Sequence, residues 1–338
     1  MDHLQQPTEA DLRAARCWFP KTDRVSGRSD ITAFKQAARW RQARWREDMG
    51  YPIGSHPGRD GLAVENGSKI EPLGPREGDY RNFLESSAVR EAVGHRCDPA
   101  TKASEPGQQF KEDRLRYDLL SSMPMCFNLF GELHNNQDRL SAAGQRLFGT
   151  TGPGRSVKFE HSPGRQNPSF SNDGTAFDVA LYFGGDGEPA TIIGIETKYH
   201  EHAIAEAAPD ASKPGRKAAS PDRLKMPRYR EITERAQAGG IFKQGWESLL
   251  GSELQQIWRD HILLLAMLQH ESKRWAGGKY VLVHPAKNPS FAEAGDRYRS
   301  EFLENDDTFA VMTVEDLLDA DVLHSAASGQ QFRDRYLW

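Results

Sequence analysis

Two carboxylates, Asp178 and Glu196, lie on a pair of segments that the sequence predicts to be neighbouring β-strands. Apolar residues alternate through residues 175–183, an isoleucine-rich run lies within 191–199, and a glycine-rich turn separates the two. This pattern predicts an antiparallel hairpin. If the turn is centred on Gly187, the pairing places Asp178 directly opposite Glu196 on one face of the hairpin.

Lys198 follows Glu196 by two residues, so the period of a strand puts both side chains on the same face. Opposed residues have Cβ atoms about 5 Å apart, and two carboxylates at that separation repel each other unless a cation lies between them. Mg²⁺ prefers hard oxygen ligands, so Asp178, Glu196 and the carbonyl of Thr197, with a substrate phosphate, would form a suitable shell. Mn²⁺ could replace it. Lys198 could then orient an attacking water, which is the chemistry of phosphodiester hydrolysis.

An ordinary surface salt bridge is the alternative for an Asp, a Glu and a Lys on one hairpin face. The apolar residues at 192–195 and at 176–177 make both strands look buried. Unpaired charges are costly in such surroundings. The sequence therefore favours a functional site over a solvated ion pair.

Five blocks of the sequence resemble the PD-(D/E)xK nuclease superfamily, and in particular one of its bacterial restriction-endonuclease-like groups. These blocks are residues 120–131, 160–165, 177–180, 193–201 and 256–261. Together they place the similarity over roughly residues 110 to 320.

The resemblance implies an α/β fold with a restriction-endonuclease-like core, in which helices flank a mixed central β-sheet. It also implies Asp178 and Glu196 as metal ligands and Lys198 as the catalytic lysine. Phe177 stands where a proline often precedes the aspartate, which is a common departure. The resemblance does not say which nucleic acid is cut.

The predicted elements follow the order of such a core. They are a helix near 113–131, a short strand at 157–160, the hairpin, a helix through 254–268 that opens with a capping box at 252–255, strands at 279–284 and 309–314, and a short helix at 315–319.

Further polar residues have two interpretations each. Glu160 would end the first core strand, where relatives of this fold bring an extra acid to the metal, although a strand-end glutamate is usually solvated. Gln256 opens the long helix, where some nuclease families use a glutamine to brace the catalytic lysine; a surface amide is the alternative. Arg165 could contact phosphate or stabilise the fold. His261 falls on the apolar stripe of the helix, which favours a core histidine.

The net charge is −4, so binding of a nucleic acid would depend on the distribution of charge rather than on its sum. Residues 31–48 carry five Lys and Arg residues and two tryptophans. This segment could be a phosphate-binding helix with Arg39 and Arg44 as contacts, and Trp40 and Trp45 either packing on the core or stacking on bases. A solvated helix with buried tryptophans is the alternative.

Composition divides the chain into two parts. Residues 50–106 are rich in Gly, Pro and charge, so we expect irregular structure with short helices such as 80–93. We therefore expect a basic, mainly helical and irregular N-terminal extension at 1–109, packing on a nuclease-like domain at 110–338. A flexible insertion is expected at about 203–235, directly after the lysine strand.

The 338 residues can bury a substantial core, although only 37% are hydrophobic and the mean hydropathy is −0.71. Cys17, Cys97 and Cys126 are odd in number and far apart, which argues against a disulfide framework and a Cys-x-x-Cys zinc site. No apolar run approaches the length of a membrane helix, and the N-terminus lacks a signal-peptide core. We expect a cytoplasmic protein without a membrane partner.

Motifs of competing chemistries are missing from the sequence, which has no Walker loop, His-Glu-x-x-His or Gly-x-Ser-x-Gly. The residues at 200–202 could bind a metal, but they are more simply the polar tail of the strand. We therefore predict a Mg²⁺-dependent nuclease that acts on DNA in restriction, defence or repair, with a homodimer as one arrangement compatible with this function. The alternative is a non-cleaving module that keeps the fold and binds nucleic acid or protein. The intact set of two acids and a lysine disfavours it.

Overall fold

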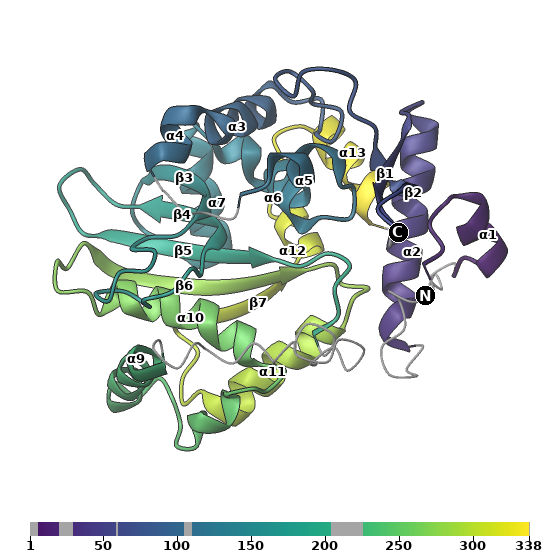
Figure 1. Cartoon of the computed structure of the whole chain (residues 1–338). Coiled ribbons are helices and arrows are strands. Elements are labelled where there is room, and N and C mark those ends of the chain that lie inside the picture. Colours follow the sequence, from purple (N-terminus) through teal and green to yellow (C-terminus); the bar gives the residue numbers. More distant parts are fainter. Residues whose placement is uncertain (1–5, 20–29, 59, 105–109, 204–225, 338) are drawn as a thin grey trace.

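A five-stranded mixed β-sheet lies at the centre of the computed structural model, which describes residues 6–19, 30–58, 60–104, 110–203 and 226–337 (Figure 1). Its strands, in spatial order, are β3 (Gly154–His161), β4 (Phe177–Phe183), β5 (Ala190–Thr197), β6 (Trp275–His284) and β7 (Phe309–Thr313). Strands β3, β4 and β5 are antiparallel neighbours, whereas β5, β6 and β7 are parallel. Parallel neighbours need long crossovers, which here contain helices. The predicted mixed sheet with flanking helices is confirmed.

The β4–β5 hairpin has the predicted register. Ala180 pairs with Gly194, which centres the turn on Gly187. Gly187 has a φ of 81°, a backbone conformation that favours glycine. Gly194 lies against the ring of Phe177, where an added Cβ would come within 2.6 Å of the ring. The turn and the close approach between the strands together fix how their residues align.

Helices cover both faces of the sheet (Figure 1). One face packs against α3 (Ser87–Cys97), α6 (Ser122–Phe130), α7 (Gln137–Phe148), α12 (Val314–Asp319) and α13 (Ala326–Tyr336), with η1 (Gly131–Leu133) after α6; the other packs against α9 (Met226–Ala238), η2 (Trp246–Leu249), α10 (Gln255–Leu268) and α11 (Ser290–Phe302). Because a strand has a period of two, Leu181 joins the first apolar cluster and Tyr182 joins the second. None of the helices in the described ranges is long and apolar enough to cross a membrane.

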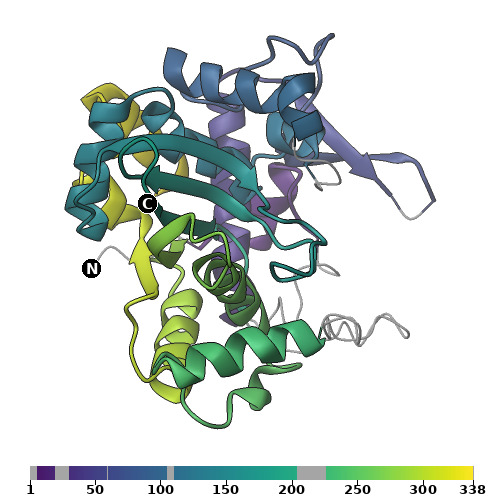
Figure 2. The ribbon, with the colours of Figure 1, turned by 90° about the vertical axis from the view of Figure 1, so that its left-hand side faces the viewer.

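The N-terminal part shares the hydrophobic interior of the sheet. It consists of α1 (Glu9–Ala14), α2 (Asp30–Asp48), β1 (Ile53–Pro57), β2 (Ala63–Ile70), α3, α4 (Pro99–Ser104) and, just after residue 109, α5 (Glu112–Tyr117). Figure 2 shows the β1–β2 hairpin extending away from the body of the protein. Phe83 and Val89 belong to the same apolar cluster as the residues of the sheet. The domain boundary at residue 109 stays a prediction.

Residues 50–106 are more regular than the sequence predicts. The β1–β2 hairpin occupies part of the segment that was expected to be irregular, and the helix expected at 80–93 begins only after Ser86, as α3. Helices α7 and α11 are further elements that the apolar spacing did not indicate. The insertion expected at 203–235 lies mostly outside the described residues, and its last part is in α9.

Two predicted helix boundaries are wrong because the chain makes other contacts there. The helix expected near 113–131 is divided into α5 and α6, since Asp118 between them forms a β-bridge with Lys69. The capping box expected at 252–255 does not form. Helix α10 begins at Gln255, whose side chain instead accepts a hydrogen bond from the backbone four residues earlier.

A buried arginine joins α2 to α13. Arg335 is 1% exposed, and its guanidinium donates to Gln42 Oε1 at 3.1 Å and to the backbone and side-chain oxygens of Asn82. Gln42 donates in turn to the Tyr199 hydroxyl at 3.0 Å. Because Tyr199 directly follows Lys198, this Arg335 network ties two helices and the loop before α3 to the end of β5.

We expect Arg335→Leu to destabilise the protein by about 3 kcal/mol, because the substitution leaves buried acceptors on Gln42 and Asn82 without their donor. Thermal and urea unfolding measure the change. Arg333→Leu is the matched control on the same helix: its side chain is 41% exposed and its ion pair is a surface contact, so we expect less than about 0.5 kcal/mol. Equal effects of the two variants would show that the Arg335 network does not stabilise the fold.

Candidate active site

Three carboxylates lie on the neighbouring strands β3, β4 and β5. The register of β3 with β4 aligns Glu160 with Asp178, and the register of β4 with β5 aligns Asp178 with Glu196. Glu160 is not at a solvated strand end, since β3 continues to His161 and Glu160 is only partly exposed. Its φ of 50° is in the left-handed region, which costs a non-glycine residue on the order of 1 kcal/mol and is found most often at functional sites.

Asp178 is held by the residue that follows Glu196. Its Oδ2 accepts a hydrogen bond from Thr197 N at 2.8 Å and another from Thr197 Oγ1 at 2.6 Å. Thr197 is fully buried. Two donors from one buried residue fix the orientation of the Asp178 carboxylate.

Lys198 lies beside Glu196, as the strand period predicts. Its Nζ is 3.1 Å from Glu196 Oε1, and the two side chains are only 8% and 13% exposed. Gln256 Nε2 donates to the same Oε1 at 3.3 Å. Gln256, which was expected to brace the lysine, therefore contacts the acid that pairs with the lysine.

Burial and mutual repulsion disfavour the charged forms of the three carboxylates. Burial, followed by the charge on Asp178, raises the pKa of Glu160 to about 8 and the pKa of Glu196 well above its ordinary value. Burial also raises the pKa of Asp178, although the hydrogen bonds from Thr197 act in the opposite direction. The fully ionised form of this carboxylate cluster, formed by Glu160, Asp178 and Glu196, is therefore unfavourable, even though the charges on Lys198, Arg96 and Arg114 lower the pKa values of its members.

Asp260 is a fourth acid near the carboxylate cluster, and it was not among the residues predicted for the site. It is 3% exposed and lies one helical turn after Gln256 on α10. Burial raises the pKa of Asp260 to about 7, although the charges on Arg259 and Lys198 lower it. The four-residue spacing from Gln256 is a signal that could have indicated it.

Arg114 is a cation near the cluster that was also not among the residues predicted for the site. It is exposed on α5, its Nε donates to Ser121 Oγ at 2.8 Å, and its charge lowers the pKa of both Glu160 and Asp178. No local pattern could have indicated Arg114, because its position depends on the break between α5 and α6.

The arginines predicted to bind nucleic acid differ in their surroundings. Arg39 is 5% exposed, and its guanidinium donates to the Cys17 carbonyl at 3.4 Å. Arg165 is half-buried and donates to the Gly174 carbonyl at 2.6 Å. Arg44 is exposed and makes an ion pair within α2. Of the three, Arg44 is the one whose side chain is exposed.

Two histidine-containing features belong to the fold. His261 is fully buried and makes hydrogen bonds of 2.9 Å with the hydroxyls of Tyr298 and Thr308, as expected for a core histidine. Glu201 accepts hydrogen bonds of 3.0 Å from the backbone N of Tyr199 and of His200. Residues 200 and 201 therefore close the end of the strand, which agrees with a polar tail.

A mixed sheet with helices on both faces, and with two acids and a lysine on its central strands, defines a restriction-endonuclease-like fold. A family model described as the PD-(D/E)XK nuclease superfamily matches residues 28–338, and the chain belongs to this superfamily. The match includes most of the N-terminal part, beyond the region that the resembling blocks indicated. Comparison with curated proteins and with solved structures finds no match to this chain.

Nucleases of this superfamily generally use divalent metal ions, and the carboxylate cluster fits such an ion. Its oxygens are hard donors, and a cation would stabilise the charged forms of Glu160 and Glu196, which burial and the charge on Asp178 disfavour. Among the described residues, no three His, Cys, Asp or Glu side chains form a ready-made metal cluster. An ion would therefore need backbone, water or substrate oxygens as well as carboxylates.

The raised pKa values of the carboxylate cluster predict how the stability of the metal-free protein depends on pH when a chelator is present. A carboxyl whose pKa is higher in the folded than in the unfolded state binds more protons when folded, so ionising it favours unfolding. For Glu160 the metal-free protein should lose stability as the pH rises from about 4.5 to about 8. We expect Glu160→Gln to remove much of this loss, because an amide does not ionise. The measurement is the melting temperature of both proteins across this pH range, with chelator present.

Glu304→Gln is the control for this experiment, because Glu304 is an exposed glutamate outside the carboxylate cluster. It should leave the dependence of stability on pH unchanged. If Glu160→Gln has the same pH dependence as the unsubstituted protein, Glu160 does not carry the expected charge penalty.

Proposed function

We propose that the protein is a metal-dependent endonuclease that hydrolyses phosphodiester bonds in DNA, in restriction, defence or repair. The observation that carries the proposal is the poorly exposed ion pair between Lys198 and Glu196, next to the aligned carboxylate of Asp178. Membership of the superfamily supports nuclease activity. The proposal includes three finer points: DNA is the substrate, Mg²⁺ is the ion, and the enzyme cuts at internal positions of the DNA strand.

Two carboxylates and a backbone oxygen would hold the ion. Asp178, Glu196 and the carbonyl of Thr197 would bind Mg²⁺, or Mn²⁺ in its place. Glu160 would add a further oxygen ligand. The bound ion would supply charge that activates water and stabilises the developing charge on the phosphate. Thr197 orients Asp178 and Gln256 orients Glu196, so these carboxylates need little rearrangement to bind it.

Lys198 would donate hydrogen bonds to the attacking water and to the phosphate oxygen on which negative charge grows. Its ion pair with Glu196 keeps the ammonium group beside the carboxylates. The ring of Phe291, 5.9 Å from Nζ, helps to exclude water from it. A poorly hydrated ammonium group interacts more strongly with a charged phosphate than a solvated one does.

Asp260 would act as a positioning residue for Lys198. Both side chains line one small cavity, together with Tyr280, whose hydroxyl is 3.5 Å from Asp260 Oδ2. The negative charge of Asp260 attracts the ammonium group from the side of α10, whereas Glu196 attracts it from the strand. Held between two acids, the lysine is kept in one orientation.

Exposed cations support a polyanionic substrate. Arg114, near the carboxylate cluster, and Arg44, on α2, are the arginines that we assign to the phosphate backbone. Arg39 and Arg165 donate to carbonyls of their own chain, so the part that we propose for them is to shape this surface.

The proposal is tested by incubating the protein with plasmid DNA, single-stranded DNA and RNA, with Mg²⁺, with Mn²⁺ and with chelator. We expect cleavage of DNA that requires the metal ion. Lys198→Ala should lower the rate by roughly 100-fold or more, because it removes a donor to the developing charge. Asp178→Asn and Glu196→Gln should abolish cleavage without lowering the melting temperature in chelator, since each relieves repulsion in the cluster.

Lys158→Ala is the matched control, because Lys158 is an exposed lysine on the neighbouring strand β3. It should cleave at the rate of the unsubstituted protein. Tight binding of DNA without cleavage under every metal condition would instead identify a binding module that retains the nuclease fold. A large loss of stability in both acid variants would count against a metal site.

The role of Asp260 gives a separate prediction. We expect Asp260→Asn to lower kcat about 10-fold to 100-fold while KM for DNA changes little, because Lys198 loses its second acidic partner but the DNA contacts remain. Single-turnover kinetics on a short duplex measure both constants. Asp296→Asn, an exposed aspartate on α11, is the control and should change neither. A rise in KM alone would assign Asp260 to substrate binding.

A further inference from the structure

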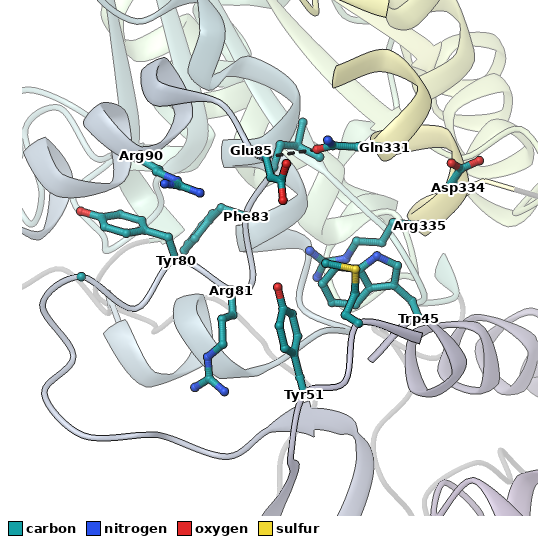
Figure 3. A pocket seen from close by; sticks show the side chains of 13 residues that line it. Trp45, Tyr51, Tyr80, Arg81, Phe83, Glu85, Arg90, Gln331, Asp334 and Arg335 are labelled. Atoms are coloured by element: carbon teal, nitrogen blue, oxygen red, sulfur yellow. Dashed lines mark hydrogen bonds between the residues drawn. The ribbon is translucent and has the colours of Figure 1, made fainter. Parts of the chain in front are cut away.

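A cavity of about 530 Å³ lies beside Arg335, between the N-terminal part and α13 (Figure 3). Four segments form its walls: the C-terminal end of α2 with the residues that follow it, the loop of residues 78–85, the first turn of α3, and α13. Ligand sites commonly measure about 300–1,000 Å³. None of its lining residues belongs to the carboxylate cluster, so this pocket is a site in its own right.

Aromatic side chains form facing walls of this pocket. In Figure 3, Tyr80 and Phe83 stand on one side, and Tyr51 and Trp45 stand on the other. The guanidinium of Arg335 lies 4.1 Å from the Trp45 ring, and the Tyr51 ring meets Trp45 edge-on with centroids 5.8 Å apart. These contacts position the rings before a ligand arrives, which lowers the entropy cost of stacking a flat molecule between them.

Two polar groups of the pocket have no hydrogen-bond partner, and a third has no ion pair, in the part of the chain that the structure describes. The Tyr51 hydroxyl and the Glu85 carboxylate point into the open space in Figure 3, and neither group is hydrogen-bonded. The guanidinium of Arg90 lies 5.8 Å from the Tyr80 ring and has no ion pair. A ligand would therefore find a hydroxyl donor and a carboxylate acceptor that have no hydrogen bonds to give up, and a cation that has no ion pair to give up.

These side chains match one class of ligand. An aliphatic molecule would leave the Tyr51 hydroxyl and the Glu85 carboxylate unpaired, which is costly on burial. A cationic molecule would meet three guanidinium groups, those of Arg81, Arg90 and Arg335, against two carboxylates, those of Glu85 and Asp334. A nucleobase has a flat ring for the aromatic walls and donors and acceptors along its edge, and its phosphate can pair with an arginine.

We propose that this pocket binds a nucleobase that carries a phosphate, either as a free nucleotide or as one base of a nucleic acid chain. The ring lies between the two aromatic walls, with Tyr51 donating to its edge and Glu85 accepting from it. Arg90 pairs with the phosphate. Binding here is a second recognition event, distinct from cleavage at the carboxylate cluster.

Isothermal titration calorimetry in chelator tests the proposal with the full chain. The probes are the four ribonucleoside 5′-monophosphates, ribose 5-phosphate, which lacks the base, and a single-stranded oligonucleotide of about 12 nucleotides. We expect at least one monophosphate to bind with a dissociation constant on the order of 10 µM, and ribose 5-phosphate not to bind. Tyr51→Phe should weaken binding about 5-fold and Arg90→Gln about 10-fold.

Arg274→Gln is the matched control, because Arg274 is an exposed arginine directly before β6 and outside the pocket. It should bind like the unsubstituted protein. Binding of the oligonucleotide alone, weakened by Tyr51→Phe and Arg90→Gln but not by Arg274→Gln, would identify a base of a nucleic acid as the ligand. Absence of binding to every probe, or equal binding by all variants, would overturn the proposal. Because chelator prevents cleavage, this outcome is independent of nuclease activity.

Discussion

Repulsion among carboxylates that a β-sheet holds in register is the constraint on which the rest of the site depends. Hydrogen bonds along the strands keep Glu160, Asp178 and Glu196 aligned, and the burial of both sheet faces prevents any strand from slipping by one residue. The acids therefore cannot relax by moving apart. The sheet retains an unfavourable concentration of charge, which is a common property of sites that bind cations.

The two helical layers contribute differently to this site. Helix α10 supplies Gln256 and Asp260 from one face of the sheet, where they surround Glu196 and Lys198. From the opposite layer, Cys126 of α6 contacts Thr197, the residue that holds Asp178. Each acid of the central hairpin is thus supported from a separate layer, so the packing of both faces determines the geometry of the site.

The sequence contains the information for those parts of the site that lie close together in the chain. The turn at Gly187 sets the hairpin register, and from it follow the positions of Asp178, Glu196 and Lys198. Other features depend on contacts between distant segments. Arg114 comes near the acids only because Asp118 pairs with Lys69 and divides a continuous apolar pattern into two helices.

Contacts between distant segments also explain why the surroundings of some arginines could not be predicted from the composition of their helix. A run of basic residues in α2 suggested contacts with phosphate, yet Arg39 faces inward toward the Cys17 carbonyl, while Trp45 packs against Arg335. Amphipathic patterning does not reveal which side of a highly charged helix meets a neighbouring element. The buried side of the helix is determined by the element that packs on it. For Trp45 this element is α13, at the far end of the sequence.

The bond between Gln42 and Arg335 joins residues 293 positions apart. A contact of such high sequence separation requires closure of a very large loop, which costs more conformational entropy than closing a local hairpin. Gln42 also donates to the hydroxyl of Tyr199, so this long-range contact helps to support the segment that carries Lys198. The environment of Lys198 therefore depends on the packing of α13 against α2, two helices that lie near opposite ends of the sequence.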